Sequence, residues 1–130
     1  DPCTLGRYNG VYDEPRALIA ATGCELVEMQ RVRDNSFCCG AGGGRIWMSE
    51  LKQGDAPRPS ESRIHEATAL ERIDFFVVCC PKDVTMYEDA IKTSGHEGEI
   101  ELRELTELVL ESLDLDAVTV AVAEPGADGD

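Results

Sequence analysis

Six cysteines stand in 130 residues, and their arrangement constrains this chain more than any other feature. Four of them form two adjacent pairs, Cys38-Cys39 and Cys79-Cys80. A disulfide between neighbouring cysteines is rare, because its geometry is strained. We expect the chain to be cytoplasmic, where thiols stay reduced and structural disulfides are uncommon. The pattern therefore indicates metal or redox chemistry rather than a disulfide scaffold.

The charge and hydropathy of the chain exclude two classes of protein. The chain carries 26 acidic and 12 basic residues, a net charge of −14. Since phosphate backbones bind basic surfaces, nucleic acid is not an expected partner. No run approaches the roughly 18 apolar residues of a membrane span, so any membrane association is expected to go through a partner. Because the sequence begins at Asp1 rather than Met, we expect a piece of a longer or processed polypeptide.

The periodicity of the apolar residues predicts helices that alternate with strands. Helices are expected over residues 14–21, 45–51, 60–73, 81–94 and 105–113. Strands are expected over residues 24–29, 75–79 and, more weakly, 100–102. The boundary signals are capping residues, a first-turn proline and stop glycines: Asp13, Gly23, Ser60 or Ser62, Pro81 and Gly95. Such alternation predicts an α/β fold with a mainly parallel sheet and flanking helices.

The predicted topology places the cysteines at one edge of this sheet. Ligands of open α/β sheets bind at the carboxyl ends of the strands. Cys79-Cys80 ends the predicted strand at 75–79, and Cys38-Cys39 is likewise expected at the carboxyl end of a strand, formed by the short apolar step before it. Cys3 lies in a loop whose preceding strand is expected to lie outside the sequence. We therefore expect three cysteine-bearing loops to converge at the carboxyl ends of the strands.

Composition divides the chain near residue 113. Residues 114–130 carry five acidic and no basic residues and end in EPGADGD, which is typical of a flexible tail. Residues 1–113 are expected to form a single cysteine-rich domain. Within it, the segment QGDAPRPS at 53–60 interrupts the helical pattern and predicts a surface loop.

Glycine and proline flank the paired cysteines. Glycine lets the backbone approach a metal cluster closely, and its amide can donate to cluster sulfur. Four glycines follow the first pair: Gly40, Gly42, Gly43 and Gly44. Pro81 follows Cys80 directly, as in the Cys-Pro edge of many iron–sulfur sites. Thiolates on separate loops with such neighbours suit an iron–sulfur cluster.

Three segments resemble one family. DPCTLGRYNGVYDEPR, NSFCCGAGGGRIWM and CCPKDVTMYEDAIK resemble the cysteine-rich CCG domain found in the B and D subunits of heterodisulfide reductase and in related iron–sulfur oxidoreductases. The family pattern is a cysteine, thirty-odd residues, Cys-Cys-Gly, a second gap and Cys-x-x-Cys. The resemblance covers roughly residues 1–113. It implies that Cys3, Cys38, Cys39 and Cys80 hold an iron–sulfur cluster, expected to be [4Fe–4S].

One position departs from that pattern. Asp83 stands where the final cysteine of a Cys-Pro-x-Cys motif belongs. Three alternatives follow: Asp83 is an oxygen ligand to one iron, the cluster is a cubane with four thiolates, or the site holds zinc, which accepts sulfur and carboxylate ligands. Cys79 is expected to be a packed strand residue, although it can replace the missing ligand. Asp83 can equally be a helix-start residue.

The resemblance implies an electron-transfer domain within a larger oxidoreductase. The implied partners are an upstream CCG domain, a ferredoxin-like module, and a flavoprotein or membrane quinone subunit. The alternative is a zinc-binding docking domain of such a complex, and whether this domain is itself catalytic stays open. A thiol–disulfide enzyme is disfavoured, because it needs a thiol of low pKa beside basic residues, and only Arg45 and Lys82 are near.

Other chemistry-bearing residues have plainer expected roles. Cys24 lies away from every motif and is expected in the core. Trp47 and Met48 are expected in the core or at an interface, and both histidines at the surface or in helix packing. Residues 7–9, Arg-Tyr-Asn, either line the site or form a turn at Asn-Gly.

Overall fold

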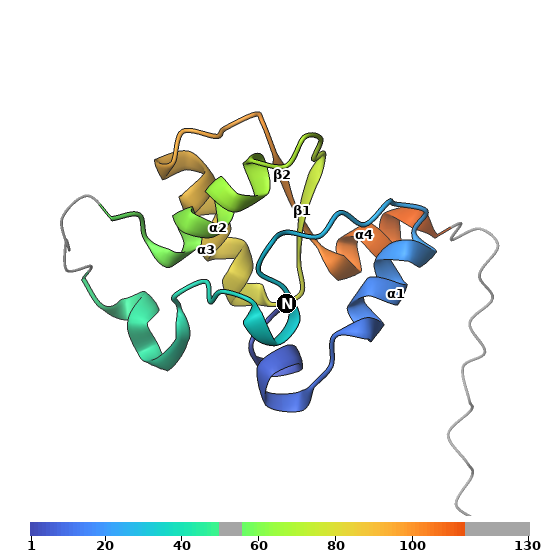
Figure 1. Ribbon diagram of the computed structural model, residues 1–130, viewed down its shortest axis with the longest axis horizontal. Helices are drawn as coiled ribbons and strands as arrows, with labels where there is room; N and C mark the ends of the chain where they lie inside the picture. Colours follow the sequence, from blue (N-terminus) through green and yellow to red (C-terminus); the bar gives the residue numbers. More distant parts are fainter. Residues whose placement is uncertain (50–55, 114–130) are drawn as a thin grey trace, which may run out of the picture.

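The computed structural model describes residues 1–49 and 56–113 (Figure 1). Its elements follow one another in this order: η1 (Thr4–Tyr8, π-helical), α1 (Asp13–Ala21), η2 (Arg33–Asn35, 3-10), η3 (Gly42–Trp47, 3-10), α2 (Pro59–Thr68), β1 (Phe75–Val78), α3 (Pro81–Thr93), β2 (Glu101–Glu104) and α4 (Leu105–Ser112). No helix within the described residues is both long and apolar enough to cross a membrane.

The sheet consists of β1 and β2, which pair in parallel with Phe75 opposite Glu101 and Val78 opposite Glu104. Aromatic and β-branched side chains favour the extended backbone of β1. Parallel neighbours require a crossover connection, which α3 supplies. The predicted α/β fold with a parallel sheet and flanking helices is therefore confirmed.

Helices cover both faces of the sheet. In Figure 1, α2 and α3 lie on one side of β1 and β2, and α1 and α4 lie on the other. The main apolar core lies between the strands and the first helix pair and comprises Ile64, Ala67, Phe76, Val78, Tyr87, Ala90, Ile91 and Ile100. The rings of Phe76 and Tyr87 meet edge to face, with centroids 4.8 Å apart. This geometry stabilises an aromatic pair beyond the area that it buries.

Local signals correctly bound several helices. Pro81 is the first residue of α3, where its missing N–H is not needed. Gly23 after α1 and Gly95 after α3 have φ values of +85° and +80°, the left-handed conformation that ends a helix at low steric cost. The final helix, predicted over 105–113, forms as α4 over Leu105–Ser112.

The strand predicted over residues 24–29 is not formed. In the described part of the chain this segment has no strand assignment, and β1 pairs with β2 alone. Its composition suits a strand, but a strand exists only where a neighbour accepts its backbone hydrogen bonds.

The predicted helix starts at Asp13 and Ser60 need correction. Asp13 is the first residue of α1 rather than its cap, which is Tyr12. Ser60 lies inside α2, and its cap is Arg58, whose backbone N–H donates to the Glu61 carboxylate at 2.9 Å. Pro59 at the first helical position moves the start of α2 upstream of both predicted serine caps.

The helix predicted over 45–51 is also wrong in its described part. A 3-10 segment, η3, begins earlier at Gly42 and ends at Trp47, and Met48 is extended. Gly43 and Gly44 have φ values of +61° and +79°, which interrupt regular helical geometry. Part of the loop predicted over 53–60 already belongs to α2, while its first three residues and the tail at 114–130 lie outside the described residues.

Candidate metal centre

The Cys79-Cys80 pair follows β1 directly, at the carboxyl end of the sheet, as predicted. Both side chains are partly buried. Cys80 is the N-cap of α3, in extended conformation with φ −143° and ψ 129°. The amino end of a helix carries partial positive charge, and this favours a thiolate or an anionic cluster beside it. The pair thus stands where negative charge is stabilised.

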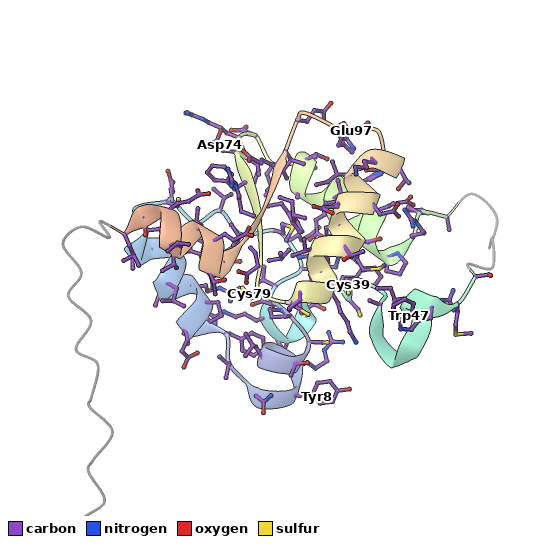
Figure 2. All side chains as sticks on the ribbon, turned by 180° about the vertical axis from the view of Figure 1, so that it is seen from behind. Tyr8, Cys39, Trp47, Asp74, Cys79 and Glu97 are labelled. Atoms are coloured by element: carbon purple, nitrogen blue, oxygen red, sulfur yellow. The ribbon has the colours of Figure 1, made fainter. Side chains whose placement is uncertain are left out.

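The Cys38-Cys39 pair reaches the same helix end from a loop. Cys39 contacts the main core, and its thiol donates a hydrogen bond to the carboxylate of Asp83 in the first turn of α3. Figure 2 shows Cys39 and Cys79 both near the beginning of that helix. No strand of the described chain precedes Cys38, so the expectation that a strand delivers this pair is wrong. Packing of the loop against α3 positions it instead.

The Cys3 segment is fastened beside the Cys38-Cys39 loop. The guanidinium of Arg7 donates to the backbone carbonyls of Ser36 at 2.6 Å and Asp34 at 3.3 Å. Ser36 is buried, so this attachment lies at the base of the loop. Cys3 itself is exposed. Arg7 therefore connects two cysteine-bearing segments. From the sequence, residues 7–9 were expected either to line the site or to form a turn, and this connecting role of Arg7 was not predicted.

Backbone amides donate to both thiols of the first pair. The N–H of Gly40 donates to Cys38 Sγ at 3.3 Å, and the N–H of Ala41 donates to the sulfur of Cys39. Gly40 has φ +92°, a conformation that favours glycine, and a Cβ there would lie 3.4 Å from Pro59. The left-handed turn at Gly40 is thus what aims two successive amides at two successive sulfurs.

The later glycines lie in a more open part of the loop. Gly42, Gly43 and Gly44 are exposed, and a Cβ at any of them would meet nothing within 4 Å. Of the residues that supply amides, Ala41 was not predicted from the sequence. Its almost complete burial beside a cysteine is visible only once the chain is folded.

Burial governs the protonation of these groups. Burial is the main cause that raises the pKa of Cys39 from 9.0 to about 12, with a smaller contribution in the same direction from the Asp83 carboxylate and an opposing one from the amide of Ala41. Burial likewise raises the pKa of Cys79 and of Asp83. In the metal-free chain Cys39 is therefore a neutral thiol at neutral pH, which disfavours its use as an attacking thiolate.

The side chains are gathered without forming a closed ligand set. Within residues 1–49 and 56–113, no three Cys, His, Asp or Glu side chains stand in an arrangement that could hold a metal ion. Cys39 contacts Asp83 directly, Cys38 is its neighbour in sequence, and the carbonyl of Cys80 accepts from the N–H of Asp83 at 2.9 Å. In its donor chemistry the site fits a soft metal centre, since thiols, a carboxylate and sulfur-directed amides meet at one helix terminus.

Three further predictions concern side chains outside the cysteine pairs. Trp47 is 88% exposed, which excludes a core position and leaves the interface alternative (Figure 2). Cys24 is partly exposed and lines a cavity beside β1, so it is not the fully buried core residue expected. Asn9 is the C-cap of η1, and its side-chain amide donates to the carbonyl of Thr4 at 2.5 Å.

Comparison with known proteins identifies relatives of the chain. The CCG family, described as a cysteine-rich domain, matches residues 1–86. The probable iron-sulfur-binding oxidoreductase FadF of Bacillus subtilis is 40% identical over 114 residues, which is 87% of this chain and 16% of that protein. The EtfAB:quinone oxidoreductase of Syntrophomonas wolfei is 32% identical over 117 residues, 88% of this chain and 16% of the relative.

An archaeal relative shows the same partial coverage. It is a subunit of the dihydromethanophenazine:CoB–CoM heterodisulfide reductase of Methanosarcina mazei, and it is 36% identical over 121 residues, 89% of this chain and 27% of the relative. The chain thus spans well under a third of the length of these three proteins. No solved structure matches the chain.

Proposed function

Because the chain belongs to the CCG family of cysteine-rich domains, we propose that it binds an iron–sulfur cluster and transfers electrons within a larger oxidoreductase. The observation that carries the proposal is the pair of amides, from Gly40 and Ala41, that donate to the sulfurs of Cys38 and Cys39. Amide donors to ligand sulfur are a principal means by which proteins tune such clusters. The name of the Bacillus relative supports the same cofactor.

The proposed ligands are Cys3, Cys38, Cys39 and Cys80, with Asp83 as the candidate for a further, oxygen ligand. Four thiolates suit a [4Fe–4S] cluster, which supplies one-electron chemistry when bound. Cys3 and Cys38 are exposed and lie on loops, so their side chains are free to turn toward the partly buried Cys39 and Cys80. Pro81 holds the start of α3, and with it Cys80, in place.

The surroundings of these thiols would adjust the reduction potential. Donation from the amides of Gly40 and Ala41 withdraws electron density from sulfur, and the amino end of α3 stabilises the added negative charge. Both effects favour the reduced state. The partly buried carboxylate of Asp83 acts in the opposite sense, because negative charge at the site opposes electron uptake.

A second candidate is a zinc-binding docking domain of an oxidoreductase complex. It is favoured by the direct contact of the Cys39 thiol with the Asp83 carboxylate, since zinc readily combines sulfur and oxygen ligands. In this alternative the site would stabilise the fold and would carry no electrons.

The proposed partners follow from the relatives. Their names describe a quinone oxidoreductase and a component of a heterodisulfide reductase. We place this chain beside a second CCG domain and a ferredoxin-like module of the same chain or complex, with a flavoprotein or membrane quinone subunit as the next electron carrier. The cytoplasm is the proposed compartment.

Metal analysis of anaerobically purified protein tests the proposal. About four irons and four sulfides per chain, with a brown colour that bleaches on reduction, are the expected result. A Cys80→Ser variant should lose the cluster, while Cys24→Ser, in the cavity beside β1, should retain it. One zinc with no iron, in protein never exposed to oxygen, would establish the docking alternative instead.

A further inference from the structure

The two histidines of the chain, His65 and His96, meet although 31 positions separate them in sequence (96 − 65). Their rings stand edge to face, with centroids 5.4 Å apart and planes inclined by 78°. His65 lies in the last turn of α2, and His96 follows α3 directly after Gly95. The pair therefore joins the ends of two helices.

The histidine pair lies at the end of the sheet away from the cysteines. The segment after α2 leads into β1, and the segment that contains His96 leads into β2, so both rings stand toward the amino ends of the parallel strands. Figure 2 shows Glu97, beside His96 in sequence, and Asp74, just before β1, at one end of the molecule, with Cys39 and Cys79 toward the other. The pair is thus separate from the candidate metal centre.

A tight turn orients the ring of His96. The N–H of Glu99 donates to the carbonyl of His96 at 3.2 Å, and Gly98 between them has φ +82°, a conformation that favours glycine. The same turn brings His96 Nδ1 within 2.6 Å of Glu99 Oε2. Because a carboxylate can only accept a hydrogen bond, Nδ1 carries the proton and Nε2 keeps its lone pair. Histidines that bind metal ions in proteins are commonly oriented by a carboxylate in this way.

The spacing of the two rings suits two imidazoles bound to one metal ion. With metal–nitrogen bonds of about 2.0–2.1 Å, the centres of two imidazole rings on a tetrahedral ion lie about 5 Å apart. The observed 5.4 Å is close to this separation. His65 is exposed, so rotation about its side-chain bonds can direct a ring nitrogen toward the ion that Nε2 of His96 would bind.

The electrostatic surroundings of the pair favour a cation. The chain has a net charge of −14, and the Glu99 carboxylate is in direct contact with His96. The carboxyl end of a helix carries partial negative charge, and His65 stands in the last turn of α2. Positive charge between the two rings is therefore stabilised by the net charge, by the carboxylate and by the helix end.

We propose that His65 and His96 together bind a divalent transition-metal ion such as Zn²⁺ or Ni²⁺, with Glu99 as the residue that positions the His96 ring. Imidazole ligands suit these ions. Among residues 1–49 and 56–113 no third protein ligand completes the set, so water fills the remaining coordination positions. The bound ion fastens the end of α2 to the turn that precedes β2. This site is independent of the cysteines and of the metal that they hold.

Nuclear magnetic resonance of the histidine rings tests the proposal in the full 130-residue chain. His65 and His96 are its only histidines, so their ring C–H signals report on this site alone even where the cysteines also take up zinc. Titration with Zn²⁺ should shift the signals of both rings together, with one dissociation constant. His65→Asn should weaken the binding seen at His96 by about tenfold or more, and His96→Asn should do the same for the binding seen at His65.

The positioning role of Glu99 has its own variant and control. Glu99→Gln should weaken zinc binding by about tenfold to a hundredfold, because the carboxylate no longer orients the His96 ring. Glu97→Gln, exposed in the same turn, should bind as the parent does. Ring signals that ignore Zn²⁺, or two rings that titrate with unrelated constants, would overturn the proposal. Single histidine variants that bind as tightly as the parent would also overturn it, and should a variant fail to fold, the joint shift in the parent chain still decides.

Discussion

The thiol of Cys39 donates a hydrogen bond to the carboxylate of Asp83, although 44 positions separate the two residues in sequence (83 − 39). Asp83 stands where the family pattern carries a cysteine. The contact places this substituted residue at the first cysteine pair. Asp83 is therefore more than a residue in the first turn of α3.

Removing the charge of Asp83 should make Cys39 more acidic. Its carboxylate contributes to the raised pKa of the Cys39 thiol, so Asp83→Asn should lower that pKa while leaving the burial largely intact. The metal-free variant should alkylate faster at Cys39 at about pH 8 to 9, close to the ordinary thiol pKa, as measured by peptide mass spectrometry with iodoacetamide. Asp89→Asn, on the exposed surface of the same helix, is the matched control. An unchanged alkylation rate at Cys39 would show that Asp83 has no electrostatic effect on it.

Restoring cysteine at position 83 should strengthen metal retention. Asp83→Cys places a thiol beside Cys39 at the amino end of α3, in addition to the four cysteines proposed as ligands. If the site holds an iron–sulfur cluster, the variant should lose iron to a chelator several-fold more slowly than the parent, because thiolate binds iron in such clusters better than carboxylate. Iron release followed by absorbance measures this, and faster release would argue that Asp83 is itself the preferred ligand.

Alkaline pH should destabilise the metal-free chain partly through Cys39. Its thiol has a pKa of about 12 in the folded chain and 9.0 as its ordinary value. The folded state therefore holds this proton more tightly, and the associated stability is present below pH 9 and is lost as pH rises toward 12. The urea midpoint should fall between about pH 8 and 10.5 in the parent under reducing conditions. Cys39→Ala should show a shallower fall, and Cys24→Ala should follow the parent.

Alanine at Gly40 should disturb both the fold and the thiols. The left-handed φ of +92° is strained for alanine, and the new Cβ would lie in van der Waals contact with Pro59. The expected loss of unfolding free energy is about 1–2 kcal/mol, measured by urea denaturation. Gly42→Ala is the matched control, since that position has open space and no positive φ. Equal losses in both variants would mean that the Gly40 turn contributes nothing particular.

Substitution of Glu66 should lower the free energy of unfolding more than substitution of most other charged residues. Its carboxylate accepts from the backbone and side chain of Arg31 and, at 2.7 Å, from the guanidinium of the buried Arg63. Glu66→Gln leaves Arg63 buried without this carboxylate partner. Removal of one partner of a buried pair is expected to destabilise by about 3 kcal/mol. Glu71→Gln, at an exposed position, should change the urea midpoint little.

Many features of the fold could be predicted from the sequence because their causes are local. Pro81 and Gly95 bound α3 through their own backbone preferences, and the apolar run beginning at Phe75 forms β1. The predicted helix cap at Ser60 is wrong, because Pro59 and the hydrogen bond from Arg58 to Glu61 together start the helix earlier. Competition among neighbouring start signals is decided by the whole first turn, which a single capping residue does not represent.

The order of the cysteine motifs by itself determined the family and the set of candidate ligands, since spacing along the chain is a property of sequence alone. Only the tertiary structure decided that the Cys39 thiol contacts Asp83, that Arg7 fastens the Cys3 segment to Ser36, and that residues 24–29 stay unpaired within the described chain. Each of these depends on a partner distant in sequence. Hydrogen bonds, burial and strand pairing depend on which distant residues the tertiary packing brings close together. The local conformational preference of a residue carries no information about those partners.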